Sequence, residues 1–287
     1  MNTGPVRFFI FTDIPVWVRP LARALEARGA DVRVSDRPEA IRPHDVVVNR
    51  ISTRVARKQP EQAETMRAAL QRWEEESRLV INGAACLELG FSKWAQVELM
   101  QSCGVAIPQT ELAQAGRRQI PDRPVLLKPQ AGGFGRGIRR LEAGEPVPDE
   151  LEGATEDGWV EQVVVEPSDG AVHRVETLGG QALYAAVSPT APDCFDYCLA
   201  HASPEVVLKP ASELSAAIAE AVAKIMSRAK MELGSVEYLL DGKGQPWFID
   251  LNPVSSLHPE AQDVLGRDPM ECTADYLWGR AESGIPM

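Results

Sequence analysis

The sequence predicts two architectures in succession, a parallel α/β region followed by α+β regions with antiparallel sheets. Three observations support this prediction. Strands and helices alternate over the first part of the chain, glycine-rich turns separate the later strands, and a late hairpin carries paired acidic side chains. Alternation of strands with helices is typical of a parallel sheet, whereas strands joined by short turns are typical of antiparallel sheets.

The first region begins with an apolar strand at Arg7–Phe11. Helical spacing of apolar residues follows from Val18 to Leu25, and Gly29 is placed to end that helix. Residues 60–76 repeat the helical pattern, with Met66, Ala69, Leu70 and Trp73 on one face. Short apolar runs predict further strands at Val32–Val34, Val46–Val48 and Leu79–Ile81. We therefore expect a Rossmann-like domain over residues 1–88, without a glycine fingerprint for dinucleotides.

The later regions should form a small domain over residues 89–165 and a larger one over residues 166–287. Ser92 can cap a helix that ends at Gly104. A long helix is expected from Ser212 to about Met231, because Leu214, Ile218, Val222 and Ile225 share one face. The predicted strands are Val125–Lys128, Val160–Val165, Val172–Thr177 and Gln181–Val187.

Composition is that of an ordinary globular protein. The chain has 287 residues, with 44% hydrophobic and 25% charged residues. Its net charge of −11 argues against a nucleic-acid or anionic-membrane surface. Five scattered cysteines do not suggest a disulfide framework. No apolar run approaches the roughly 18 residues of a membrane span, and no signal-peptide pattern is present. We expect a cytoplasmic protein without nucleic-acid or membrane partners.

The hairpin at Gly234–Pro253 is the most informative stretch. If Leu240 pairs with Trp247, Glu237 lies opposite Asp250, with Cβ atoms about 5 Å apart. Asn252 projects from the same face as Asp250. Facing carboxylates repel unless a proton or cation lies between them, and oxygen ligands suit Mg²⁺. Taken alone, the hairpin is better explained as a solvated charged face, and the rest of the chain reverses that preference.

A glycine-rich loop follows the strand that ends at Lys128. Four glycines within six residues allow the backbone to approach phosphate oxygens: Gly132, Gly133, Gly135 and Gly137. The loop lacks the Gly-Lys-Ser/Thr ending of a P-loop. A flexible hairpin turn would explain the glycines equally well. Downstream, an edge strand at Trp159–Val163 could bind adenine through free backbone groups, with Glu166 on the ribose.

Taken in order, these segments resemble the ATP-grasp superfamily, and most closely its RimK-like, glutathione-synthetase-type branch. The similarity covers most of the chain and includes the following motifs: Ser92-Lys93, Leu127-Lys128-Pro129, the glycine loop, Val160-Glu161-Gln162-Val163, His173-Arg174-Val175, Gly234-x-Val236-Glu237 and Phe248-Ile249-Asp250-Leu251-Asn252-Pro253. Val48-Asn49-Arg50-Ile51-Ser52 and Val80-Ile81-Asn82-Gly83 are similar to the N-terminal domain of that branch.

The resemblance implies an ATP-grasp fold with an N-terminal Rossmann-like pre-ATP-grasp domain and a carboxylate–amine ligase activity that releases ADP. It assigns phosphate contacts to Lys93 and Lys128, and a position near the transferred phosphate to Arg174. The glycine loop would form a lid. Glu161 and Val163 would border adenine and Glu166 the ribose, while Glu237, Asp250 and Asn252 would hold two Mg²⁺ ions.

The substrates should be a small-molecule carboxylate and amine. Arginines that usually follow the strand at Ala185–Val187 in glutamate-adding relatives are replaced by Ser188-Pro189-Thr190 and the residues after them. We therefore expect a small amino acid or specialised metabolite. The candidate pocket residues are Arg50, His201, Ser255 and His258, although Arg50 could instead form a salt bridge between domains. A small-molecule kinase and a non-catalytic ATP-binding protein are the alternatives, and a homodimer is an assembly that we allow for.

Overall fold

The first region contains a four-stranded parallel sheet, as predicted. The computed structural model describes residues 4–113, 122–133, 135–146, 158–190 and 206–284. The strand order is β2-β1-β3-β4, with every pair parallel. These strands are β1 (Arg7–Phe11), β2 (Asp31–Ser35), β3 (Val46–Asn49) and β4 (Val80–Ile81).

Helices cover both faces of this sheet, because β1 carries consecutive apolar side chains that point alternately to one face and the other. Phe8 and Ile10 pack towards α1, whereas Phe9 and Phe11 pack towards Trp73 of α3, with Phe11 and Trp73 ring centroids 5.0 Å apart. Burial of each such side chain contributes about 1.5–3 kcal/mol. The helices of this region are α1 (Pro15–Ala27), α2 (Arg54–Lys58), α3 (Pro60–Glu75) and α4 (Ala84–Phe91).

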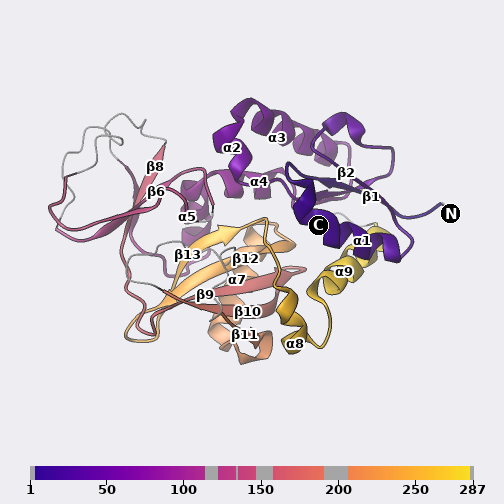
Figure 1. Cartoon of the computed structure of the whole chain (residues 1–287). Coiled ribbons are helices and arrows are strands. Elements are labelled where there is room, and N and C mark those ends of the chain that lie inside the picture. The colour runs from indigo at the N-terminus through magenta and orange to yellow at the C-terminus, as the bar shows by residue number, and fades with distance from the viewer. Residues whose placement is uncertain (1–3, 114–121, 134, 147–157, 191–205, 285–287) are drawn as a thin grey trace.

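The second region lies apart from the first in Figure 1 and holds a four-stranded antiparallel sheet. Helix α5 leads into it, and Ser92 caps that helix as predicted, accepting a hydrogen bond of 3.1 Å from the Ala95 backbone N–H. The strand order is β5-β8-β6-β7. Strand β8 is therefore an inner strand, and the prediction that Trp159–Val163 forms an edge strand was wrong. The elements are α5 (Lys93–Ser102), β5 (Thr110–Leu112), β6 (Val125–Pro129), β7 (Arg139–Leu141) and β8 (Trp159–Val163).

The third region is a five-stranded antiparallel sheet with order β11-β10-β9-β12-β13, packed against α7. Helix α7 begins at Ala216, four residues later than expected, because Ser215 caps it and residues 211–213 form a 3₁₀ turn. The elements are β9 (Ala171–Leu178), β10 (Gln181–Pro189), β11 (Val207–Pro210), α7 (Ala216–Arg228), β12 (Leu233–Leu240), β13 (Pro246–Asn252), α8 (Gln262–Leu265) and α9 (Pro269–Ser283).

Two features join the first region to the third. Helix α9 lies beside α1 (Figure 1), and its Ala274 and Leu277 belong to the same apolar core as Phe8 and Leu25. Asn82 is buried with a φ of 58°, and its amide binds the backbone of Leu233 and Pro253. These contacts place the carboxyl ends of the parallel strands beside the end of β13.

No helix in the described parts of the chain is both long and apolar enough to span a bilayer.

Candidate active site

Two carboxylates face each other across the β12–β13 hairpin, as predicted, but through a different register. Leu240 pairs with Pro246 rather than with Trp247, and Leu239 takes Trp247. A β-bulge between Glu237 and Tyr238 then restores the expected pairing of Glu237 with Asp250. A bulge places an extra residue in one strand and so changes the face on which later side chains point.

Glu237 is buried, and cationic side chains of the protein lie close to it. Only 5% of its surface is exposed, and its Oε1 accepts hydrogen bonds from Arg174 Nη1 at 2.6 Å and from Asn252 Nδ2 at 3.2 Å. Burial raises the pKa of Glu237, the Arg174 charge opposes this shift, and Asp250 adds to it. The structure therefore brings together Glu237, Asp250 and Asn252, the predicted metal residues.

Arg174 organises a buried network that extends beyond the hairpin. Its Nε donates to Glu176 Oε1 at 2.7 Å and its Nη2 donates to Ser255 Oγ at 2.7 Å. The Ser255 hydroxyl in turn donates to Glu176. Glu176 is completely buried, so this pairing offsets the cost of removing its charge from water. The network connects β9, β12 and the loop after β13.

Lys93 and Lys128 approach the carboxylates from the second region. The Lys93 ammonium forms an ion pair with Asp250. Lys128 is only 4% exposed, and burial lowers its pKa to about 8, with the Lys93 charge acting in the same direction and Asp250 and Glu237 opposing it. Gln130 fixes the geometry, since its backbone carbonyl accepts from Lys93 N–H at 3.1 Å and its side chain accepts from Trp94 N–H at 3.0 Å.

The described glycines of the loop differ in how strongly the structure requires them. A Cβ atom at Gly133 would lie 2.8 Å from Thr53 Oγ1, too close for unshifted neighbours. Gly135 and Gly137 have φ values of 63° and 84°, which side chains disfavour. Gly132 has room, because the nearest atom to its Cβ would be 3.9 Å away. The loop therefore approaches α2 of the first region at Gly133.

The expected adenine and ribose residues lie on and after β8. Glu161 is 9% exposed and pairs in register with Leu127 and Glu111. The backbone N–H of Val163 donates to the Gln109 carbonyl at 2.8 Å, so it is not the free edge group that we expected. Glu166 forms an ion pair with Arg140 of β7 at 2.7 Å and its side chain is mostly exposed.

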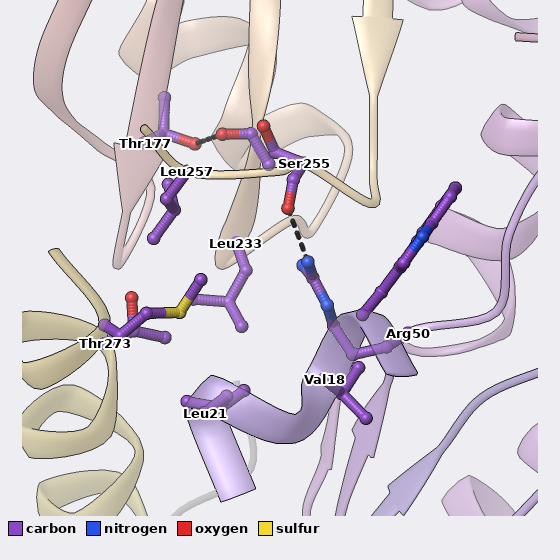
Figure 2. Close-up of a pocket in the computed structure, with 11 residues that line it drawn as sticks. Val18, Leu21, Arg50, Thr177, Leu233, Ser255, Leu257 and Thr273 are labelled. Atoms are coloured by element: carbon purple, nitrogen blue, oxygen red, sulfur yellow. Dashed lines mark hydrogen bonds between the residues drawn. The ribbon is translucent and has the colours of Figure 1, made fainter. Parts of the chain in front are cut away.

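Arg50 lines a cavity of about 280 Å³ between α1, α9 and the loop after β13. Its Nη2 donates to the Ser255 backbone carbonyl at 2.5 Å, and its buried Nε has no hydrogen-bond partner in the described part of the chain (Figure 2). Ser255 also lines the cavity. His258 does not line the cavity. Its ring lies edge-on to that of Tyr184, with the ring centroids 6.4 Å apart, and burial lowers the pKa of His258. His201 lies outside the described residues.

Several residues that build this site were missed by sequence reasoning. Glu176 lies two residues after Arg174 on the same face of β9, a signal that could have been noticed. Gln96 holds α5 against β13 by accepting from Leu251 N–H and donating to the Leu251 carbonyl. Gln130 was read only as part of the loop. Such contacts join segments far apart in sequence, which alternation patterns do not reveal.

Comparisons with solved structures agree with this architecture, although no family model and no curated protein matches the chain. ATP-grasp ligase PsnB, complexed with minimal precursor, Mg and ADP, has a TM-score of 0.65 at 17% identity, covering 98% of this chain and 100% of its own. D-cycloserine synthetase DcsG has a TM-score of 0.63 at 16% identity, with coverages of 98% and 100%. A RimK domain ATP-grasp protein from Sphaerobacter thermophilus DSM 20745 has a TM-score of 0.58 at 19% identity, with coverages of 96% and 100%.

The chain therefore has the ATP-grasp fold, as the sequence motifs predicted. The similarity runs over nearly the full length of each of these structures. At such low identity it defines the fold and leaves the reaction to be argued from the residues of the site.

Proposed function

We propose that the chain is an ATP-dependent ligase that joins a carboxylate to an amine through an acyl phosphate and releases ADP and phosphate. The observation that carries this proposal is the facing pair of the buried Glu237 and the partly buried Asp250, with Lys93, Lys128 and Arg174 disposed around it. Few structural roles require two facing carboxylates and three cations together, with three of these five side chains buried. A polyphosphate with its metal ions uses all of them.

The donor set fits Mg²⁺ together with ATP. In the described residues no three acidic, histidine or cysteine side chains gather as a complete metal cage. Two carboxylates and the Asn252 amide are nevertheless oxygen donors, and Mg²⁺ ordinarily takes its remaining ligands from water and substrate phosphates. Glu237, Asp250 and Asn252 would hold the ions, and Mg²⁺ would supply charge neutralisation on the phosphates. Lys93, which now pairs with Asp250, would be free to turn to a phosphate.

The side chains account for the chemistry without a protein nucleophile. Phosphoryl transfer depends mostly on positioning and on neutralising charge in a water-poor site. Lys128 is buried with its pKa lowered to about 8, and a phosphate beside it would raise that pKa and keep the ammonium charged. Arg174 is held by Glu176 and Ser255, and we expect its guanidinium to contact the transferring phosphate. The glycine loop would cover the phosphates and exclude water.

The proposed ligase could act on a peptide or on small molecules. Of the similar structures, PsnB was solved with a precursor peptide and DcsG is a D-cycloserine synthetase, so peptide and small-molecule substrates both occur on this fold. We favour small-molecule carboxylate and amine substrates for this chain. The end of β10 and the one described residue after it, Ser188 to Thr190, contain no arginine to clamp an acidic substrate.

Hydroxylamine trapping separates the ligase from a small-molecule kinase. The protein is incubated with Mg·ATP, hydroxylamine and a panel of amino acids and dipeptides, and ADP and hydroxamates are measured. The ligase forms a hydroxamate whose mass identifies the activated carboxylate. ADP release with a stable phosphorylated alcohol or amine and no hydroxamate would identify a kinase, and absence of any ADP release with bound nucleotide would identify an ATP-binding protein.

A further inference from the structure

The cavity beside Arg50 is lined mainly by apolar side chains, which the proposed phosphate transfer does not require. Its volume of about 280 Å³ is near the lower end of ordinary ligand pockets. Apolar side chains from three separate segments form its walls: Trp17 and Val18 of α1, Leu257 of the loop after β13, and Met270 of α9. Figure 2 shows a smaller adjoining hollow of about 30 Å³, which Val18, Leu257 and Arg50 border from different elements and which shares these three residues with the cavity.

The polar groups around the cavity are mostly engaged elsewhere. In the adjoining hollow of about 30 Å³, Thr177 Oγ1 donates to the Gly234 carbonyl at 2.8 Å, and Thr273 Oγ1 donates to the Pro269 carbonyl at 2.9 Å. Asp268 at the rim accepts from Met270 N–H at 2.7 Å as the cap of α9. Arg50 differs, because its buried Nε is unpartnered and no carboxylate pairs with it in the described residues.

The cavity is also adjacent to the carboxylate pair. Ser255 forms part of its wall, and the same residue accepts a hydrogen bond from Arg174, which contacts Glu237. A molecule bound against Arg50 would therefore lie one side chain away from the network that surrounds the metal residues. This adjacency makes the cavity part of a substrate site rather than an isolated surface hollow.

We propose that this cavity selects a substrate with an apolar side chain of leucine to phenylalanine size beside a carboxylate that Arg50 holds. The inference rests on the proposed ligase function and names the class of substrate. The guanidinium offers a charge-assisted hydrogen bond to the carboxylate, and the apolar walls exclude polar or acidic side chains. A free amino acid and the C-terminal residue of a peptide share this chemistry.

Calorimetric titration of the full chain tests the selection, with and without Mg·ADP. The probes are phenylalanine, leucine, alanine, glutamate, the dipeptide Gly-Phe and phenethylamine, which lacks the carboxylate. We expect phenylalanine and leucine, or Gly-Phe, to bind at least about tenfold tighter than alanine or glutamate. Phenethylamine should bind at least about tenfold more weakly than phenylalanine. Tighter binding of Gly-Phe than of phenylalanine would identify a peptide end as the source.

A matched pair of variants sharpens this test. Leu257→Asp places a charge in the wall and should weaken phenylalanine binding at least about tenfold, with the melting temperature as a check on folding. Val16→Asp is the control, since Val16 is 56% exposed on α1 and does not line the cavity. Equal binding of phenylalanine and alanine, preference for glutamate, or undiminished binding of phenethylamine would overturn the proposal.

The same experiments separate this inference from the ligase function. ATP-dependent ligation of alanine or glutamate, without preference for apolar side chains, would remove the cavity assignment and leave the ligase intact. Phenylalanine binding that is lost in Leu257→Asp, without ADP release from any panel member, would support the cavity and remove the ligase.

Discussion

Arg174 and Arg50 both donate a hydrogen bond to Ser255, but among the described residues only Arg174 of the two has carboxylate partners. Arg174 pairs with Glu176 at 2.7 Å and with Glu237 at 2.6 Å. Arg50 pairs with no carboxylate in the described residues and donates to a backbone carbonyl. Burial accordingly lowers the pKa of Arg50 to about 10, although the Glu176 charge acts against the shift.

The two lysines repeat this contrast. Lys93 pairs with Asp250, whereas Lys128 has no ion pair among the described residues and its pKa is lowered to about 8. The comparison teaches where anionic ligands belong. Arg174 and Lys93 hold the site in shape through ion pairs with carboxylates, for which a bound metal would compete, whereas Lys128 and Arg50 can meet a phosphate or a substrate carboxylate without first giving up an ion pair with a described residue.

The largest expected effect comes from breaking the neutralised side with Arg174→Met. Loss of the guanidinium leaves Glu176 and Glu237 buried without the cation that pairs with both of them. We expect the free energy of unfolding to fall by about 3–5 kcal/mol, measured by urea denaturation. Arg67→Met is the control, because Arg67 pairs with Glu64 at the surface and its loss should lower stability far less than that of Arg174. If Arg174→Met lowered the free energy of unfolding no more than Arg67→Met does, Arg174 would not be the cation that stabilises the buried carboxylates.

The second effect concerns the carboxylate that Arg174 contacts. Glu237→Gln preserves shape but removes a charge that metal binding needs, so ADP release should fall by about 100- to 1,000-fold. The measurement is steady-state ADP release, with the melting temperature as a check. Glu232→Gln is a matched control, since Glu232 is 4% exposed and pairs with Arg280 away from the site. It should lower stability and keep the turnover; near-normal turnover in Glu237→Gln would remove the metal assignment.

The sequence was sufficient where the signal was local. Alternation predicted the strands of the first region, and Arg7–Phe11 was found with the expected bounds. Alternation also placed Glu237 opposite Asp250, but only because the bulge between Glu237 and Tyr238 compensated for an incorrect pairing of Leu240. A bulge is a local irregularity of backbone pairing that residue types on the two strands do not specify.

The parts that were missed depend on contacts between distant segments. The hydrogen bond from Ser255 to Glu176 spans 79 positions of the chain. Helix α9 escaped notice because its buried face is small and mixed, with Thr273, Ala274 and Leu277. Asn82 acquires its role from a positive φ and from four backbone partners in the third region and the loop after it. None of these is visible before the regions are assembled.

The third prediction uses the pH dependence of Lys128. Its folded-state pKa of about 8 is below the usual 10.5, so the protonated form is disfavoured and burial costs stability below pH 8. That penalty disappears as the pH rises from about 8 towards 10.5. Bound phosphate should reverse the shift, and binding of Mg·ATP should then take up a proton near pH 9 but not near pH 6.

Calorimetry in buffers of different ionisation enthalpy measures this proton uptake. Affinity for Mg·ATP should weaken by up to about tenfold per unit above pH 8. Lys128→Met should lose the proton uptake and much of the affinity. Lys243→Met, in an exposed turn of the hairpin, is the control and should keep both. Equal proton uptake by Lys128→Met and the unmodified protein would show that Lys128 does not meet the phosphates.

The smallest expected effect on stability comes from Arg50→Met. This change removes one hydrogen bond to the Ser255 carbonyl, and it also removes a charge for which the chain provides no carboxylate. The two contributions oppose each other, so the free energy of unfolding should change by less than about 1 kcal/mol or increase slightly. Urea denaturation beside Arg174→Met makes the comparison direct. Binding of a substrate carboxylate should nevertheless fall at least about tenfold, because its charged partner is gone. If Arg50→Met lowered stability as much as Arg174→Met, the charge of Arg50 would be compensated within the fold. The contrast between the two arginines would then no longer indicate that Arg50 binds a substrate carboxylate.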